Sequence, residues 1–311
     1  MASKGRSRHQ ASIKPREDRR FLGIGMVLLA YLTFTGIDTS AKWLVINGMP
    51  SLQVVFSRYA VQLVLVLAWI LPTYGLAAFK SNALGLEITR AVMLLLATIF
   101  NFFAIAYLPL TVTASILFTM PLILCALSIP LLGETVGWRR WVAILVGFIG
   151  VLVIIQPGGS GFHWAMLLSL VSVSVYALYN IISRKLAGVD PTHTQQLYSA
   201  LVATVCIVPF AFLEWMWPRD PVEWTAFLIM GALAAFGHLL LTVAHRMAEA
   251  SVLAPFVYPH IIYMTAASWL VFGQAPDIWI FVGAPIVIGS GLYIWLREKQ
   301  LSVKPPDARI S

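Results

Sequence analysis

Ten apolar runs, separated by short polar or charged connections, take up most of this 311-residue chain. A helix needs about 20 apolar residues to cross a bilayer, and every backbone polar group in lipid must find its partner within the helix. The runs are therefore predicted to be transmembrane helices. They cover residues 22–46, 51–71, 84–107, 110–132, 138–155, 163–183, 194–213, 224–243, 251–272 and 278–296.

The composition excludes the main classes of soluble protein. Hydrophobic residues make up 59% of the chain and charged residues 11%, whereas a soluble domain has roughly 45–50% and about 25%. One core cannot bury so much apolar surface, because the surface of a folded chain grows too fast with its size. A soluble enzyme, a nucleic-acid-binding protein and a disordered protein are thus excluded. The net charge of +8 comes from residues at the ends of the runs, so we expect a lipid bilayer and no nucleic acid as partner.

The positions of Lys and Arg predict how the chain is oriented. With the N-terminus inside, the inside segments contain 18 of these residues, whereas the outside loops contain Arg219 alone. Short cytoplasmic segments of membrane proteins carry such an excess of positive charge. We therefore expect both termini to be cytoplasmic and the protein to be a multi-pass protein of the cell inner (plasma) membrane.

The two halves of the chain resemble each other at an offset of about 140 residues. The fourth run ends in Leu132-Gly133-Glu134, and the ninth ends in Phe272-Gly273-Gln274. Because five helices are an odd number, the second copy must lie upside down relative to the first. The predicted fold class is an all-α membrane protein of ten transmembrane helices in two inverted five-helix repeats. Its expected parts are a basic cytoplasmic tail (1–20), a first repeat (21–156), a linker (157–162), a second repeat (163–297) and a cytoplasmic tail (298–311).

These features resemble the EamA-type transporters of the drug/metabolite transporter (DMT) superfamily. The resemblance covers about residues 20–297 and rests on the span number, the repeats, Pro121 before Leu132-Gly133-Glu134, and Ala254-Pro255 before Phe272-Gly273. Gln274 departs from the pattern, in which a Glu commonly follows the glycine. The resemblance implies a substrate cavity between spans one, three, four, six, eight and nine, near the midplane. Similar proteins include exporters of amino acids, drugs and metallophores, and uptake systems for riboflavin and S-adenosylmethionine.

Three charged residues inside predicted spans are candidates for a substrate or coupling site. Asp38 and Lys42 lie four residues apart in the first span, and Arg58 lies in the second. At about 1.5 Å per residue, Asp38 and Arg58 both lie roughly 10–12 Å below the outer ends of their spans. Since isolated charges in lipid are costly, this pattern predicts a buried ion pair of Asp38 with Arg58, with Lys42 one turn nearer the outside. The three residues together carry a net charge of +1. The pair either clamps two helices together or attracts an anionic group such as a carboxylate.

Polar and aromatic residues inside other spans complete the candidates. Such side chains hydrogen-bond to a ligand or stack on a flat one, and helix packing is the alternative explanation. The candidates are Asn101, Tyr176, Tyr179, Asn180, His238, Tyr258, His260 and Tyr263. His260 is expected near the midplane, beside Pro255 and Pro259, which we expect to open the ninth helix because proline donates no backbone hydrogen bond.

The chemistry-bearing motifs of pumps and enzymes do not occur in this sequence. A Walker A sequence, a metal-binding His pair and a nucleophile elbow are all missing, so we expect no enzyme activity, cofactor or metal site. The sequence therefore predicts a secondary-active transporter of a small metabolite that works by alternating access. The substrate is a vitamin such as riboflavin, or an amino acid or other carboxylate. A drug or amino-acid exporter of the same fold is the alternative, and a membrane-embedded enzyme or a non-transporting scaffold is the alternative of another class. The sequence leaves open a proton or sodium ion as coupling ion, and a monomer or homodimer.

Overall fold

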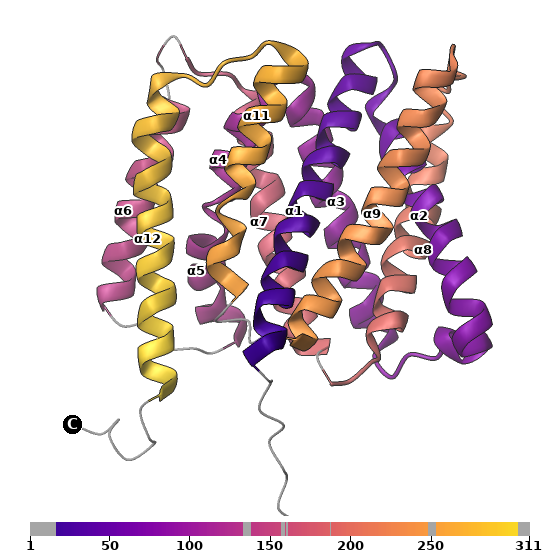
Figure 1. The fold of residues 1–311 in the computed structure, drawn as a ribbon, viewed down its shortest axis with the longest axis horizontal. Coiled ribbons are helices and arrows are strands. Elements are labelled where there is room, and N and C mark those ends of the chain that lie inside the picture. Colours follow the sequence, from indigo (N-terminus) through magenta and orange to yellow (C-terminus); the bar gives the residue numbers. More distant parts are fainter. Residues whose placement is uncertain are drawn as a thin grey trace, which may run out of the picture.

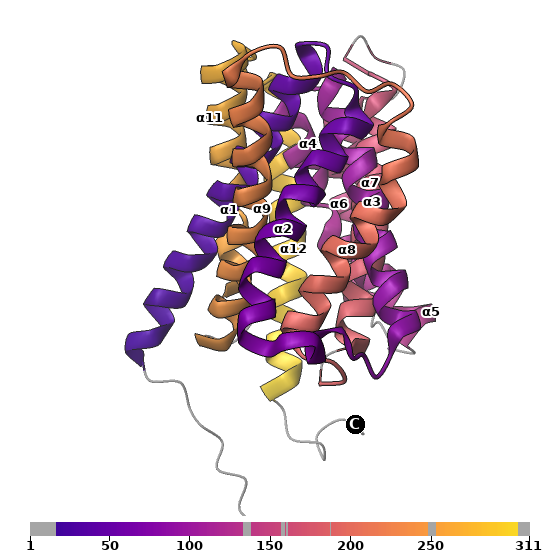
Figure 2. The ribbon, with the colours of Figure 1, turned by 90° about the vertical axis from the view of Figure 1, so that its right-hand side faces the viewer.

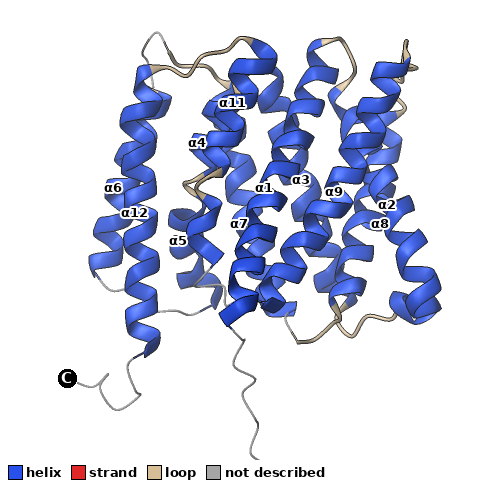
Figure 3. Cartoon of the chain, in the orientation of Figure 1, coloured by secondary structure: helices blue, strands red, loops and turns tan. Residues whose placement is uncertain are grey.

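The computed structural model describes residues 17–132, 138–156, 159, 161–186, 188–247 and 253–303. All elements in these ranges are helices, and the long ones run roughly along one common direction (Figure 1, Figure 3). The predicted tails 1–20 and 298–311 and the linker 157–162 lie partly outside the described residues. Residues 133–137 and 248–252 lie wholly outside them.

Within the described ranges, seven helices are long and apolar enough to cross a membrane. They belong to α1 (Glu17–Ile46), α2 (Ser51–Tyr74) with η1 (Gly75–Phe79), α3 (Leu84–Tyr107), α7 (Ala165–Leu186), α8 (Thr192–Ala211), α9 (Pro221–Met247) and α12 (Ile278–Val303). Each coincides with a run that the sequence predicts to be a transmembrane helix. The apolar, all-helical character of the chain is therefore confirmed.

The other three predicted spans contain shorter apolar helices. They are α4 (Leu110–Leu117) and α5 (Met120–Leu132), α6 (Trp138–Ile155), and η2 (Ala254–Val257) and α11 (His260–Phe272). The prediction of one continuous helix over 110–132 is wrong, because the helix is interrupted at Phe118 and Thr119. Pro121 follows this break and has no N–H to donate to the preceding turn. In 251–272 the helix is interrupted at Tyr258 and Pro259, where the prolines predict an opening.

The closest helix pairs join the first half of the chain to the second. Four such pairs pack along each other: α1 with α9, α3 with α7, α2 with α8, and α6 with α12. Figure 1 shows α6 and α12 side by side at one edge of the bundle, and in Figure 2, turned by 90°, this edge lies behind the other helices. A Cβ on Gly283 would lie 2.7 Å from the Gly150 carbonyl oxygen, so this pair needs glycine for its close approach.

The two largest clusters of buried apolar side chains form most of the core. One joins α1, α2, α3, α4, α8, α9 and α11, and the other joins α3, α4, α5, α6, α7 and α12. The first helix begins and the last helix ends at the same end of the bundle (Figure 1). We call this the α1-start end, and the opposite end the α1-finish end.

Candidate functional site

A cavity of about 510 Å³ lies among the helices of both halves. Its lining comes from α1, α2, α3, α4, α5, α7, α9, α11 and α12, with members of both core clusters. The lining extends toward the α1-start end through Val27, Leu241 and Trp295. Its volume falls in the range of ~300–1,000 Å³ that is typical of small-molecule sites. The resemblance implies walls from six spans, and the structure adds α2 and α12 to them.

Eight of the eleven residues that the sequence singles out line this cavity. They are Asp38, Arg58, Asn101, Tyr176, Asn180, His238, Tyr258 and His260. The other three, Lys42, Tyr179 and Tyr263, are not among the described lining residues. Residues from helices far apart in the sequence are thus brought to one place, and most of them lie at middle depth in their helices.

The structure does not form the predicted ion pair of Asp38 with Arg58. Among the described side chains, no Lys or Arg nitrogen lies within 4.0 Å of its carboxylate. Asp38 instead accepts a hydrogen bond from Asn101 Nδ2 at 3.1 Å. Arg58 lies within electrostatic reach of Asp38 but bonds to Thr98 Oγ1 at 3.4 Å and stacks on the Tyr59 ring at 4.4 Å. Asn101 from α3 takes the place that the sequence assigns to a cation.

Lys42 has partners that no sequence pattern indicates. Its Nζ donates to the Leu108 carbonyl oxygen and to Gln274 Oε1 (2.9 Å), and it lies 5.1 Å from the Phe272 ring centre. The side chain is 1% exposed. Lys42 therefore ties α1 to the α3–α4 connection and to the end of α11, on the α1-finish side of the cavity. We call Lys42, Leu108, Phe272 and Gln274 the Lys42 cluster.

Aromatic rings from α1, α9 and α11 form a continuous strip, which we call the aromatic wall. Tyr31 contacts Phe34 and His260, with ring centres 5.8 and 5.1 Å apart, and Phe34 contacts His238 at 5.3 Å. All four residues line the cavity. The sequence analysis overlooks Tyr31 and Phe34, although they precede Asp38 by seven and four residues and so share its helix face.

The two interrupted helices meet at the cavity. Phe118, at the break between α4 and α5, lies against Tyr258, at the break before α11, with ring centres 5.4 Å apart. His260 follows this second break and is 3% exposed. Neither of its ring nitrogens has a hydrogen-bond partner among the described residues. Buried polar groups usually have partners, so His260 presents unused hydrogen-bonding capacity to the cavity.

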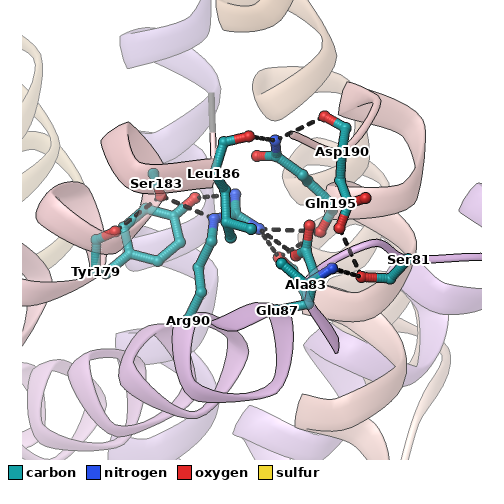
Figure 4. A network of polar contacts seen from close by, with 10 residues as sticks. Ser81, Ala83, Glu87, Arg90, Tyr179, Ser183, Leu186, Asp190 and Gln195 are labelled. Atoms are coloured by element: carbon teal, nitrogen blue, oxygen red, sulfur yellow. Dashed lines mark hydrogen bonds and ion pairs between the residues drawn. The ribbon is translucent and has the colours of Figure 1, made fainter. Parts of the chain in front are cut away.

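Tyr179 belongs to a second polar network (Figure 4), and its neighbour Tyr176 lines the cavity. The Tyr179 hydroxyl accepts from Arg90 Nη2 at 2.8 Å, and its ring stacks on Tyr176. Arg90 also donates to the Ser183 hydroxyl, the Gln195 carbonyl and the Ser199 hydroxyl at 2.8–3.0 Å, and lies 3.7 Å from Glu87. This Arg90 network ties α3 to α7 and α8. Arg90 is not among the candidate site residues that the sequence indicates.

Asp190, in the connection between α7 and α8, forms hydrogen bonds with the connection that precedes α3. Its carboxylate accepts hydrogen bonds from the Ser81 hydroxyl and from the Asn82 backbone N–H (2.7 Å). Desolvation by burial favours the neutral acid, but the hydrogen bonds from Ser81 and Asn82 outweigh it and lower the pKa of Asp190. The ionised carboxylate thus joins the connection before α3 to the connection before α8.

Comparisons with known proteins give the family. A model of the EamA-like transporter family matches residues 21–156 and 163–296. The chain is 30% identical over 278 residues to the riboflavin transporter of Vibrio cholerae, covering 88% of this chain and 93% of that one. It is 27% identical over 283 residues to the S-adenosylmethionine uptake transporter of Rickettsia bellii, covering 91% and 96%.

A solved crystal structure shares the fold, with a TM-score of 0.61 at 17% identity, covering 92% of this chain and 99% of that one. The family and the named relatives are transporters and not enzymes. With seven helices in the described ranges that are able to span a bilayer, the chain is a multi-pass membrane protein. It belongs to the EamA-like transporter family.

Proposed function

We propose that this protein is a secondary-active transporter that carries a small, ring-bearing metabolite across the inner membrane by alternating access. One observation carries the proposal: a single cavity receives charged, hydrogen-bonding and aromatic side chains from both halves of the chain. Charged residues in membrane spans commonly mark a substrate pathway. In transporters with internal repeats the substrate site lies between the repeats.

The packing of the helices supports two inverted repeats. In the predicted numbering of spans, α1 packs on α9 as span one on span eight, and α3 packs on α7 as span three on span six. Span one shifted forward by five is span six, and span eight shifted back by five is span three, so the first pair becomes the second. The same shift exchanges the two members of the pair α2 and α8, which are spans two and seven, so that this pair is unchanged. It likewise leaves unchanged the pair α6 and α12, which are spans five and ten. This exchange is the relation expected of two copies of one five-helix unit.

The Lys42 cluster supports a state that is closed on one side. It joins segments of both halves beyond Asp38, on the α1-finish side, whereas the cavity lining extends toward the α1-start end. The distribution of Lys and Arg assigns the α1-start end to the cytoplasm. We infer an inward-facing state in which the Lys42 cluster is the outer closure, and an outward-facing state in which it separates.

Riboflavin is the substrate that we propose first. The aromatic wall offers rings on which a flat ring system can stack, and His260 offers free hydrogen-bonding atoms. Relatives from Vibrio cholerae and Rhizobium johnstonii are named riboflavin transporters. Export of an amino acid or another carboxylate is the second candidate, because Arg58 is a cavity-lining cation with no carboxylate within 4.0 Å among the described residues.

Growth of a riboflavin-auxotrophic bacterium that lacks its own uptake system tests this function. We expect the protein to restore growth at low external riboflavin, while the empty vector does not. The same cells are then challenged with toxic amino-acid analogues. Absence of growth with normal membrane abundance, together with resistance to the analogues, would refute riboflavin uptake and favour the second candidate.

A further inference from the structure

The described lining of the cavity carries more positive than negative formal charge. Among the described lining residues, three side chains carry a formal charge: Asp38, Arg58 and Arg184. Arg58 lies about two turns inside α2 and is buried, whereas Arg184 lies near the end of α7 and is exposed. A ligand that reaches middle depth therefore meets two cations and one carboxylate along the lining.

The carboxylate of Asp38 has a hydrogen-bond partner, whereas one hydrogen-bond donor of Arg58 has none among the described residues. Asp38 accepts the hydrogen bond from Asn101. Arg58 is 6% exposed, and its Nε has no hydrogen-bond partner in the described part of the chain. Its contacts with the Thr98 hydroxyl at 3.4 Å and with the Tyr59 ring involve neutral groups, and Asp38 lies within electrostatic reach but forms no ion pair with it within 4.0 Å. A buried guanidinium with an unused donor favours an acceptor atom on a ligand.

The buried positive charge of Arg58 also repels a ligand that carries a positive charge. Charges interact more strongly in a protein interior than in water, and less of the interaction is screened by salt. Specific sites commonly use such repulsion to exclude a competing ligand of similar size. A cationic ligand that reaches middle depth here would have to lie near Arg58 without a second carboxylate to balance it.

We infer that the cavity admits neutral or anionic ring compounds and excludes compounds with net positive charge, and that Arg58 sets this selectivity. The inference rests on the proposed transport function and narrows its substrate class. It separates the two substrates for which relatives are named. Riboflavin is neutral and has ring carbonyls that can accept from a guanidinium. S-adenosylmethionine carries a sulfonium and an ammonium group against one carboxylate.

Uptake into proteoliposomes tests the inference, with radiolabelled riboflavin and radiolabelled S-adenosylmethionine measured separately. We expect saturable riboflavin uptake, and S-adenosylmethionine uptake at the level of protein-free vesicles. Excess unlabelled S-adenosylmethionine should leave riboflavin uptake unchanged. Arg58→Gln should weaken riboflavin uptake about tenfold, as for the loss of one hydrogen bond to a charged group, and should let S-adenosylmethionine compete.

Two further variants separate the effect of the positive charge of Arg58 from the effect of its guanidinium shape and position. Arg58→Lys keeps the charge and loses the guanidinium fork, so it should lower riboflavin uptake and still exclude S-adenosylmethionine. Lys185→Gln removes the same charge from an exposed position that does not line the cavity, and both measurements should match the original protein. Exclusion of S-adenosylmethionine by Arg58→Gln as strict as that of the original protein would refute the role of Arg58.

The possible failures can be told apart. S-adenosylmethionine uptake by the unaltered protein at a rate comparable to that of riboflavin would overturn the inference and leave the transport function intact. Uptake of neither compound by a folded, reconstituted protein would overturn the riboflavin proposal, and the inference with it. If Arg58→Gln does not fold, the unaltered protein and Arg58→Lys still decide whether cations are excluded.

Discussion

At the scale of single residues, the cavity combines polar atoms that have partners with polar atoms that do not. Asn101 donates to Asp38, and Asn180 Nδ2 donates to the Tyr176 carbonyl oxygen of its own helix. His260 and Arg58 Nε have no such partner among the described residues. A ligand or water molecule that bonds to these two residues offsets the cost of their burial, which is why we assign them to substrate recognition.

The charge of Asp190 predicts a dependence of stability on pH. Because folding lowers the pKa of Asp190, its ionised form stabilises the folded protein. This stabilisation is fully present above the unfolded pKa of about 3.9 and is lost as the pH falls through the folded pKa. We expect the purified protein to lose stability below about pH 4 more steeply than Asp190→Asn does.

Thermal unfolding in detergent, followed from neutral to acidic pH, measures this difference. The amide of Asp190→Asn keeps an acceptor for Ser81 but does not titrate, so it is the matched control. Parallel stability curves for the two proteins would show that Asp190 makes no pH-dependent contribution.

At the scale of helices, the Arg90 network predicts a large effect on stability. Arg90→Ala removes the hydrogen bonds that Arg90 donates to Tyr179, Ser183 and Ser199. It also leaves the buried carboxylate of Glu87 without its cation. Breaking a buried charge pair in this way typically costs about 3–5 kcal/mol. We expect a clear fall in melting temperature and in membrane abundance.

A second substitution isolates the cost of the stranded carboxylate. Glu87 is fully buried, and its carboxylate oxygens have no hydrogen-bond partner in the described ranges. Glu87→Gln in the Arg90→Ala background removes the unpaired charge and should recover part of the lost stability. No recovery would mean that the hydrogen bonds of Arg90, rather than its charge, hold the three helices together.

The positions of the helices could be predicted from the sequence, whereas their interruptions and contacts could not all be. Long apolar runs indicate α1, α2 and α3 directly, because lipid leaves few other backbone structures available. Pro121 does not by itself predict the break at Phe118 and Thr119, since prolines are tolerated in membrane helices when neighbouring groups satisfy the freed carbonyls.

The candidate residues were easier to find than their partners. Asp38 and Arg58 stand out because charge is rare in an apolar run. Asp38 and Lys42 both lie on α1, but their spacing does not predict their contacts. A principal partner of Lys42 is a backbone carbonyl, that of Leu108, and any residue type carries such a group. Gln274 lies 232 residues from Lys42 in the sequence, and only the packing of α11 near α1 brings them together.

At the scale of the whole molecule, the proposed transport requires a cavity that opens to each side of the membrane in turn. In the inward-facing state that we propose, the Lys42 cluster lies between the cavity and the outer surface, and joins segments of both halves. Lys42→Ala removes both hydrogen bonds and the cation–ring contact. It should therefore shift the population toward the outward-facing state, because it destabilises contacts that belong to the inward-facing state alone.

Thiol labelling of one cavity position from each side of the membrane tests this claim most directly. Leu117 lines the cavity and is partly exposed, and Leu117→Cys places a thiol there. The background carries Cys125→Ala and Cys206→Ala, with Asn47→Cys and Lys80→Cys as separate outer and inner controls. With Lys42 present, an impermeant maleimide should label Leu117→Cys from the cytoplasmic side, and Lys42→Ala should make it reactive from the outside as well. Labelling from one side alone in both backgrounds, in protein that still transports, would contradict alternating access through this cavity.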